Sequence, residues 1–265
     1  MSEATAPAAT TALYVYGVVP AGTKLALSGG GVESTDVEVV EAGDVAAIVG
    51  VVPLEEFGAE ALPRNFNDRD WLERAAQAHE AVLERALGTT TVIPFRIATL
   101  YASEDSLLEF MQERGPTMAE LLQHLAGKVE LGVKAYFDRE RERRETPKES
   151  GAGSGPGQAY LLERQAQQAA TEEADAFAIG CAQESHERLA WAALGATVNR
   201  PQPPELSGRS EQMILNGAYL VARDDTGLED VVRGLEDRYG ERGVTYEITG
   251  PWPPYNFVPR DLVGP

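Results

Sequence analysis

The residues that most often carry chemistry are few and scattered in this sequence. The three histidines, His79, His124 and His186, and the single cysteine, Cys181, lie far apart. They form neither the HExxH nor the paired CxxC spacing that a zinc site needs. His79 and His186 each precede a glutamate on an expected exposed helix face, where surface or capping histidines are the usual case. The sequence therefore predicts no metal site.

Nucleophilic catalysis has no visible basis either. No serine lies in a GxSxG elbow, and Ser154 lies in a Gly-rich stretch without the strand-turn-helix context that an elbow needs. No cation beside Cys181 would lower the pKa of its thiol, so we expect a small buried side chain there. Neighbouring acids such as Glu172 and Glu173 cannot face each other across a cleft from one helix. We predict no catalytic residue, no bound cofactor and no enzymatic activity.

Length and charge restrict the remaining classes of protein. A chain of 265 residues that is 43% hydrophobic can bury the cores of two domains. A formal net charge of −19 repels phosphate backbones and anionic lipids, so we expect no nucleic-acid partner and no membrane partner. One cysteine excludes an internal disulfide and fits a reducing cytoplasm. Residues 1–11 are small and polar, and we expect them to form a disordered leader.

The first part of the chain alternates strand and helix patterns. Pro94 cannot donate to a sheet ladder, so its strand contains a bulge or lies at an edge. Arg96, in the same apolar run, is expected to pair with a carboxylate or extend its head into solvent rather than to bind a ligand. Gly115 and Pro116 predict a break in the helix that Ser103 begins. The expected elements are strands 13–19, 37–40, 45–52, 89–100 and 129–137, and helices 68–87, 103–111 and 117–126.

These elements predict an antiparallel or mixed sheet with helices on one face, in an α+β domain of ferredoxin-like type over residues 12–138. Residues 139–158 begin with a stretch of charged residues and continue with a Gly-, Ser- and Pro-rich run. This composition predicts a flexible linker. The glycines there match no phosphate-binding spacing.

Residues 159–265 repeat the mixed pattern more loosely. A helix over 159–193 comes first, and Gly180 is expected to mark a weak point or a close helix contact in it. Strands at 194–199, 213–222 and 244–249 follow, with an apolar helical stripe between the last two. The sequence thus predicts a second, degenerate ferredoxin-like domain that a long helical segment precedes and an aromatic and proline-rich tail ends.

That tail is the most distinctive stretch of the chain. Three prolines between 251 and 254 hold the backbone extended, so the segment has little entropy left to lose on docking. We hypothesise that the rings of Trp252, Tyr255 and Phe257 bind a partner. The alternative is that they only seal the hydrophobic core over strands 213–222 and 244–249.

Several stretches together resemble a known family. They are LYVYGVV, WLERAAQAHE, TVIPFRIATLYASEDSL, LAGKVELGVKAYFD and TGPWPPYNFV, which occur in this order over nearly the whole chain. The chain resembles the gas vesicle protein F/L family (GvpF/GvpL). The resemblance implies a two-domain α+β protein that is a minor vesicle component or assembly accessory in the cytoplasm and on the gas vesicle. Its implied partner is the hydrophobic shell protein (GvpA type), which it would keep from aggregating, with other accessory proteins as further candidates.

Two other classes stay open at this stage. A ferredoxin-like fold hosts many unrelated tasks, so the chain could instead be a small-molecule-binding regulatory module. An enzyme would need a cluster assembled from distant residues, for instance Arg96 with carboxylates. A pocket with convergent polar groups would favour the small-molecule ligand, whereas an apolar patch would favour a protein partner.

Overall fold

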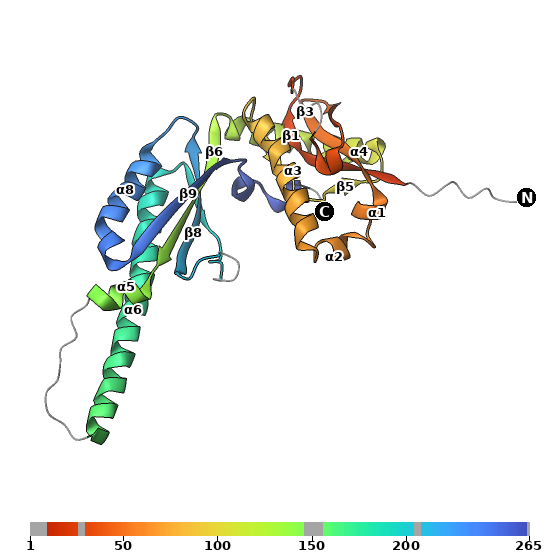
Figure 1. Ribbon diagram of the computed structural model, residues 1–265. Coiled ribbons are helices and arrows are strands. Elements are labelled where there is room, and N and C mark those ends of the chain that lie inside the picture. Colours follow the sequence, from red (N-terminus) through yellow and green to blue (C-terminus); the bar gives the residue numbers. More distant parts are fainter. Residues whose placement is uncertain (1–9, 26–29, 146–155, 204–207, 264–265) are drawn as a thin grey trace, which may run out of the picture. The chain divides into compact units, whose positions relative to one another are not determined.

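The computed structural model describes residues 10–25, 30–145, 156–203 and 208–263 (Figure 1). Over these residues the chain forms helices and two antiparallel sheets, which confirms the predicted α+β class. The chain divides into two compact units, Met1–Val129 with Trp252–Pro265, and Glu130–Pro251. Residues 1–9 of the predicted leader lie outside the described residues, and the first strand already begins at Thr11.

The first unit contains a sheet with strand order β2-β3-β1-β4, and β5 also pairs with β1. A turn at Gly43 and Asp44 joins β2 to β3 and forms the predicted hairpin. Pro94 lies in the edge strand β4, as its missing N–H predicts. The elements are β1 (Thr11–Pro20), β2 (Val37–Ala42), β3 (Val45–Pro53), α1 (Leu54–Phe57), α2 (Leu62–Asn65), α3 (Arg69–Leu87), β4 (Ile93–Pro94), β5 (Leu100–Tyr101) and α4 (Glu104–Leu125).

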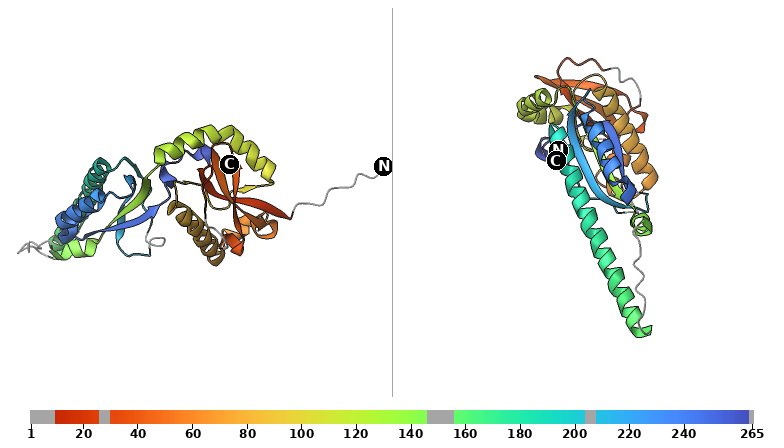
Figure 2. Two further views of the ribbon diagram at one scale, coloured as in Figure 1. Left: turned by 90° about the horizontal axis from the view of Figure 1, so that it is seen from above. Right: turned by 90° about the vertical axis from the view of Figure 1, so that its left-hand side faces the viewer.

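Helices cover both faces of this sheet. Residues are buried continuously from Tyr14 to Val19 in β1 and from Val45 to Gly50 in β3. Continuous burial is expected where both faces of a strand are covered. Figure 2 shows α3 and α4 on opposite faces of the sheet. The predicted arrangement with helices on one face is therefore wrong, because these apolar strands need cover on both sides.

Helix α4 continues through Pro116, where the sequence predicted a break. An interior proline removes one helical hydrogen bond and crowds the preceding turn, at a cost of about 3 kcal/mol. Burial of an apolar stripe offsets this cost, so packing on the sheet overrides the local signal. The buried large side chains of the helix are Leu107, Met111, Met118, Leu122 and Leu125.

The second unit contains a sheet with strand order β7-β8-β6-β9. Helix α6 packs on this sheet and α8 packs beside α6. Strand β7 alternates between half-buried and exposed positions, the pattern of a strand with one open face. The elements are β6 (Lys128–Phe137), α5 (Arg139–Glu145), α6 (Pro156–Ala192), β7 (Gly195–Val198), β8 (Gln212–Ala222), α8 (Gly227–Tyr239) and β9 (Val244–Trp252).

This division differs from the boundary predicted at residues 139–158. The sequence places strand 129–137 in the first domain, but β6 lies between β8 and β9 in the second sheet. The predicted linker lies inside the second unit: 139–145 form α5, 156–158 belong to α6, and 146–155 are outside the described residues. An apolar strand pattern does not say which sheet the strand joins, and this is why the sequence misplaces β6.

Helix α6 is unbroken over its 37 residues. Its buried positions recur at helical spacing and face the sheet: Ala174, Ala178, Cys181, Ser185 and Leu189. Residues 160–170 are all exposed, and both figures show this half of α6 projecting beyond the sheet (Figures 1 and 2). A Cβ added to Gly180 would meet no atom within 4 Å, so Gly180 marks neither a break nor a close helix contact.

Replacing Gly180 by alanine is expected to stabilise the second unit by about 0.5–1 kcal/mol. Alanine costs less than glycine inside a helix and restricts the unfolded chain, and nothing at this site opposes a methyl group. A higher urea midpoint with an unchanged m value would be the signature. Destabilisation would reveal a close contact at this position.

Candidate interaction site

The end of the chain, which carries the predicted binding residues, completes the first unit. Strand β9 extends to Trp252, beyond the Thr249 end that the sequence predicts. Two short 3-10 turns follow, at Tyr255–Phe257 and Arg260–Leu262. We call Trp252–Pro265 the tail. Its buried residues in the described part are Pro253, Pro254, Val258, Leu262 and Val263.

A hydrogen bond ties the tail to helix α3. The Tyr255 hydroxyl donates to Glu80 Oε1 over 2.7 Å. Burial raises the pKa of the Glu80 carboxyl, and the hydrogen bond from Tyr255 opposes this rise. The second carboxyl oxygen of Glu80 is buried without a hydrogen-bond partner in the described part of the chain. The contact thus fixes the tail on α3 while keeping a carboxyl group partly out of water.

The rings of Trp252, Tyr255 and Phe257 are all half-buried. Half-burial in the first unit matches neither of the two arrangements predicted from the sequence, which were rings displayed to a partner and rings packed over strands 213–222 and 244–249. The rings are not fully displayed, and their segment belongs to the first unit rather than to the core over β8 and β9. Partner binding by these three residues stays a proposal, and it rests on the part of each ring that solvent reaches.

His79 is buried, contrary to its predicted place on an exposed helix face. Its Nε2 lies 3.1 Å from the Phe95 carbonyl, which only accepts, so Nε2 carries the proton. Its Nδ1 then accepts from the Tyr14 hydroxyl over 2.9 Å, and the Tyr14 oxygen accepts from the Ala98 N–H over 3.1 Å. Burial lowers the pKa of His79 to about 4. This neutral, fully bonded histidine has a structural role.

The other candidate reactive groups do not converge on a reactive site in the described part of the chain. Cys181 is buried as predicted, and burial raises the pKa of its thiol, which disfavours the nucleophilic thiolate. His186 is half-buried and bonds the Tyr219 hydroxyl over 3.1 Å, so its predicted exposed position is wrong too. Arg96 is exposed and extends into solvent as expected. Among the described residues, no three His, Cys, Asp or Glu side chains gather as metal ligands would.

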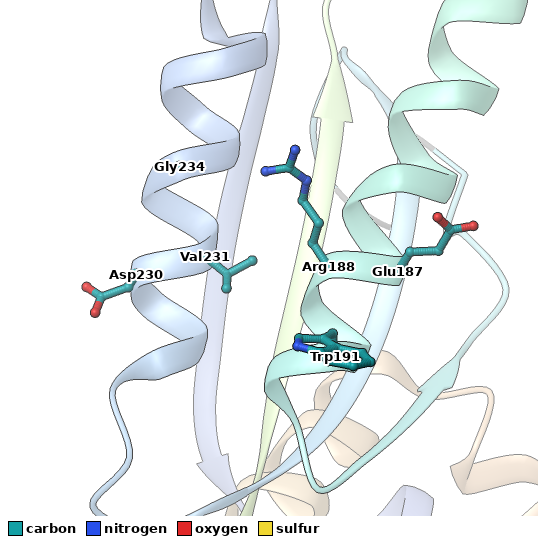
Figure 3. A pocket seen from close by; sticks show the side chains of 6 residues that line it. All are labelled: Glu187, Arg188, Trp191, Asp230, Val231 and Gly234. Carbon is teal, nitrogen blue, oxygen red and sulfur yellow. The ribbon is translucent and has the colours of Figure 1, made fainter.

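Sequence reasoning missed a groove between α6 and α8 in the second unit (Figure 3). It is open, holds about 560 Å³, and is lined by Glu187, Arg188, Trp191, Asp230, Val231 and Gly234. Figure 3 shows Trp191 on α6 and Val231 on α8 facing each other across it. Trp191 is 93% exposed.

A helical signal for Trp191 does exist in the sequence. Leu189 is buried toward the sheet, and a residue two positions later lies about 200° further around the helix. If Leu189 faces the core, Trp191 must therefore face away from it. The sequence alone does not say which face of this long helix is buried, and for that reason the signal was not usable.

Comparison with known protein families identifies the family of this chain. The sequence profile described as gas vesicle synthesis protein GvpL/GvpF matches residues 12–259. The chain belongs to the GvpL/GvpF family. The match spans both units and most of the tail, and it confirms the resemblance carried by the sequence motifs.

Relatives of both named types within the GvpL/GvpF family align over nearly the whole chain. Gas vesicle protein L of Streptomyces sp. (strain CB03234) is 32% identical over 259 residues, which cover 92% of each chain. Gas vesicle protein F of Haloferax mediterranei is 25% identical over 253 residues, covering 93% of this chain and 92% of that one.

Solved GvpF structures share the fold. The crystal structure of GvpF from Anabaena sp. PCC7120 has a TM-score of 0.68 and 20% identity, and covers 94% of this chain and 96% of its own. The GvpF structure from Microcystis aeruginosa has a TM-score of 0.64 and 19% identity, with 93% and 98% covered. The fold of this chain is therefore similar to the fold of these GvpF structures.

Proposed function

We propose that this chain takes part in gas vesicle formation by binding the hydrophobic shell protein (GvpA type) and keeping it from aggregating while a vesicle nucleates. The family match over residues 12–259 carries the proposal. Shell subunits of a gas-filled wall must expose apolar surface before they assemble, and such surface promotes aggregation. A partner with a formal net charge of −19 that covers this surface would keep the complex dispersed by charge repulsion.

In this proposal the tail supplies a binding surface through Trp252, Tyr255 and Phe257. Their rings are half-exposed, and aromatic side chains are enriched among the residues that dominate binding energy. Buried prolines and the bond to Glu80 hold the segment in place before a partner arrives. Such preorganisation lowers the entropy cost of binding.

The proposal includes a location and excludes catalysis. We place the chain in the cytoplasm and on the gas vesicle, with other accessory proteins as further partners and without a cofactor. Within the described ranges, no helix combines the length and the apolar character needed to cross a bilayer. The groove between α6 and α8 is open and presents Trp191 and Val231, which suits a protein better than a small polar ligand.

The ferredoxin-like assignment belongs to the same proposal. The second unit supports it, since apart from the short helix α5 and the 3-10 turn Gly240–Arg242 its described elements follow the order β6, α6, β7, β8, α8 and β9. This is a β-α-β-β-α-β sequence with both long helices packed together. In the first unit the 3-10 turn Val32–Ser34 is the only described helical turn between β1 and β2. We therefore infer that the first unit, rather than the second as the sequence suggested, is the degenerate one.

Binding of the purified shell protein to the full-length chain tests the proposal. Changing Trp252 and Tyr255 together to alanine is expected to weaken binding by about 2 kcal/mol or more, because it removes two aromatic anchors. The urea midpoint should fall much less, since both rings are half-exposed in the free chain. Light scattering of the shell protein alone and with the chain would measure protection from aggregation.

Tyr255→Phe serves as the matched control, because it keeps the ring and removes only the hydroxyl that bonds Glu80. It should bind the shell protein nearly as well as the wild type. If the double variant lost binding only in proportion to its loss of fold, the tail would be an anchor and not a binding surface. A wild-type chain that neither binds the shell protein nor prevents its aggregation would refute the proposed function itself.

A further inference from the structure

The groove between α6 and α8 exposes an aromatic ring that the fold does not use. Trp191 is 93% exposed, although tryptophan is highly buried on average in soluble proteins. It lies at the end of α6, and Val231 of α8 faces it across the groove (Figure 3). Val231 is half-buried, whereas its neighbour Val232 is buried. Two elements of the second unit thus direct apolar surface into one open groove.

Gly234 keeps the α8 side of this groove free of side chains. A Cβ added there would meet no atom within 4 Å, so nothing in the described chain requires a residue this small. Glycine also weakens a helix interior relative to alanine. An outside group that approaches α8 closely would give the small residue a use.

Charged side chains from both helices line the groove. Figure 3 shows Glu187 and Asp230 pointing away from the groove on its two outer sides, and Arg188 between the helices. Arg188 is paired with Glu184 at 2.8 Å, a carboxylate that Arg238 shares at 3.4 Å, and Asp230 is paired with Arg233 at 2.7 Å. Glu187 accepts a hydrogen bond from Gln183 over 3.0 Å and meets no cation within the described residues. The groove therefore has apolar side chains on both helices with Arg188 between them, and the carboxylate of Glu187 on the α6 side is left to meet a cation from outside.

We propose that this groove binds a helix of a partner protein that carries an apolar stripe with lysine or arginine on the side that faces α6. The stripe would lie over Trp191 and Val231, and the basic residues would reach Glu187, while Asp230 on the α8 side is already paired with Arg233. Two packed helices that present an apolar groove are a recurring way to receive a third helix. A second copy of this chain is a poor occupant, because two copies with formal net charges of −19 repel each other.

The test uses a synthetic amphipathic helix of leucine and lysine, about 18 residues and thus roughly 27 Å long, and the same peptide with glutamate for lysine. Binding to the full-length chain is measured by calorimetry. Trp191→Ala removes the ring, and Gly234→Leu fills the groove. Each change should weaken binding of the lysine peptide at least about tenfold, the effect expected of a dominant contact residue.

Ile179→Ala is the matched control, since Ile179 is 69% exposed and lies about 120° around α6 from Trp191. It should change the affinity less than about twofold. The urea midpoint is recorded for every variant, and Trp191→Ala should not alter it because the ring is exposed. Lysine-peptide binding that Trp191→Ala and Gly234→Leu both leave intact would be attraction to the net charge alone and would overturn the proposal. Equal loss with Ile179→Ala, or equal binding of the glutamate peptide, would overturn it as well.

Discussion

Lowering the pH from 7 to 4 is expected to destabilise the first unit by about 3 kcal/mol through His79 alone. The pKa of this residue is about 4 in the folded chain and 6.5 in its ordinary state. Between these values the unfolded chain binds the proton more strongly than the folded chain. Stability is therefore complete above the ordinary pKa, falls as the pH drops through this window, and levels off below about 4.

The physical reason is the hydrogen-bond network around the ring. A second proton would be placed on Nδ1, which now accepts from the Tyr14 hydroxyl. The Tyr14 oxygen would then have to accept from Nδ1 as well as from the Ala98 N–H, and the Tyr14 hydroxyl proton would lose its acceptor. At 2% exposure the imidazolium would also lose its hydration.

His79→Gln isolates this effect, because glutamine keeps a donor and an acceptor but does not titrate in this range. Urea unfolding at pH 7, 5 and 4 should give a shallower pH dependence for the variant than for the wild type. The many carboxylates contribute equally to both chains and cancel in the difference. Parallel curves for the two proteins would show that His79 does not control acid stability.

Deleting the tail, Trp252–Pro265, is expected to cost the first unit about 5 kcal/mol. Three aliphatic side chains, those of Val258, Leu262 and Val263, are buried there, and each contributes at least about 1.5 kcal/mol. The loss equals much of the total stability of an ordinary domain. Hydrogen exchange should therefore show lost protection in β1 and β3.

Strand β8 in the second unit serves as the internal control for this deletion. The second unit ends at Pro251, so the amides of β8 should remain protected. Tyr255→Phe should cost only about 1 kcal/mol, the contribution of one hydrogen bond. If β1 and β3 kept their protection without the tail, the tail would be an appendage rather than part of the core.

Local sequence patterns predicted the elements whose burial depends on neighbours in the chain. Strands 13–19 and 45–52 and the helix at 68–87 were predictable because apolar residues recur there at strand or helix spacing. His79 lies on the same stripe as Ala75 and Val82, and that spacing was a usable signal for its burial. Its bonding partners were not predictable, since Tyr14 is 65 residues away in the sequence.

Contacts between distant segments account for the features that the sequence could not give. Strand β6 has the same apolar pattern whichever sheet it joins, and its place between β8 and β9 depends on pairing far along the chain. The aromatic and proline-rich pattern of the tail distinguishes it from the rest of the chain, but it does not predict that the tail contacts α3. Helix α4 shows the opposite case, in which packing overrides a strong local signal at Pro116.

The return of the tail to the first unit also sets the order in which the chain can mature on the ribosome. Residues up to 129 emerge first, but their closing segment follows only after the whole second unit, about 120 residues later. At about 5–20 residues per second this delay is roughly 6–25 s. The apolar surface that Val258, Leu262 and Val263 cover stays bare throughout that interval. The last strand of the second unit, β9, is made directly before the tail, so the second unit is complete in sequence before the first. Products of premature termination would keep this surface exposed, which makes them distinguishable to the quality-control machinery from the complete chain.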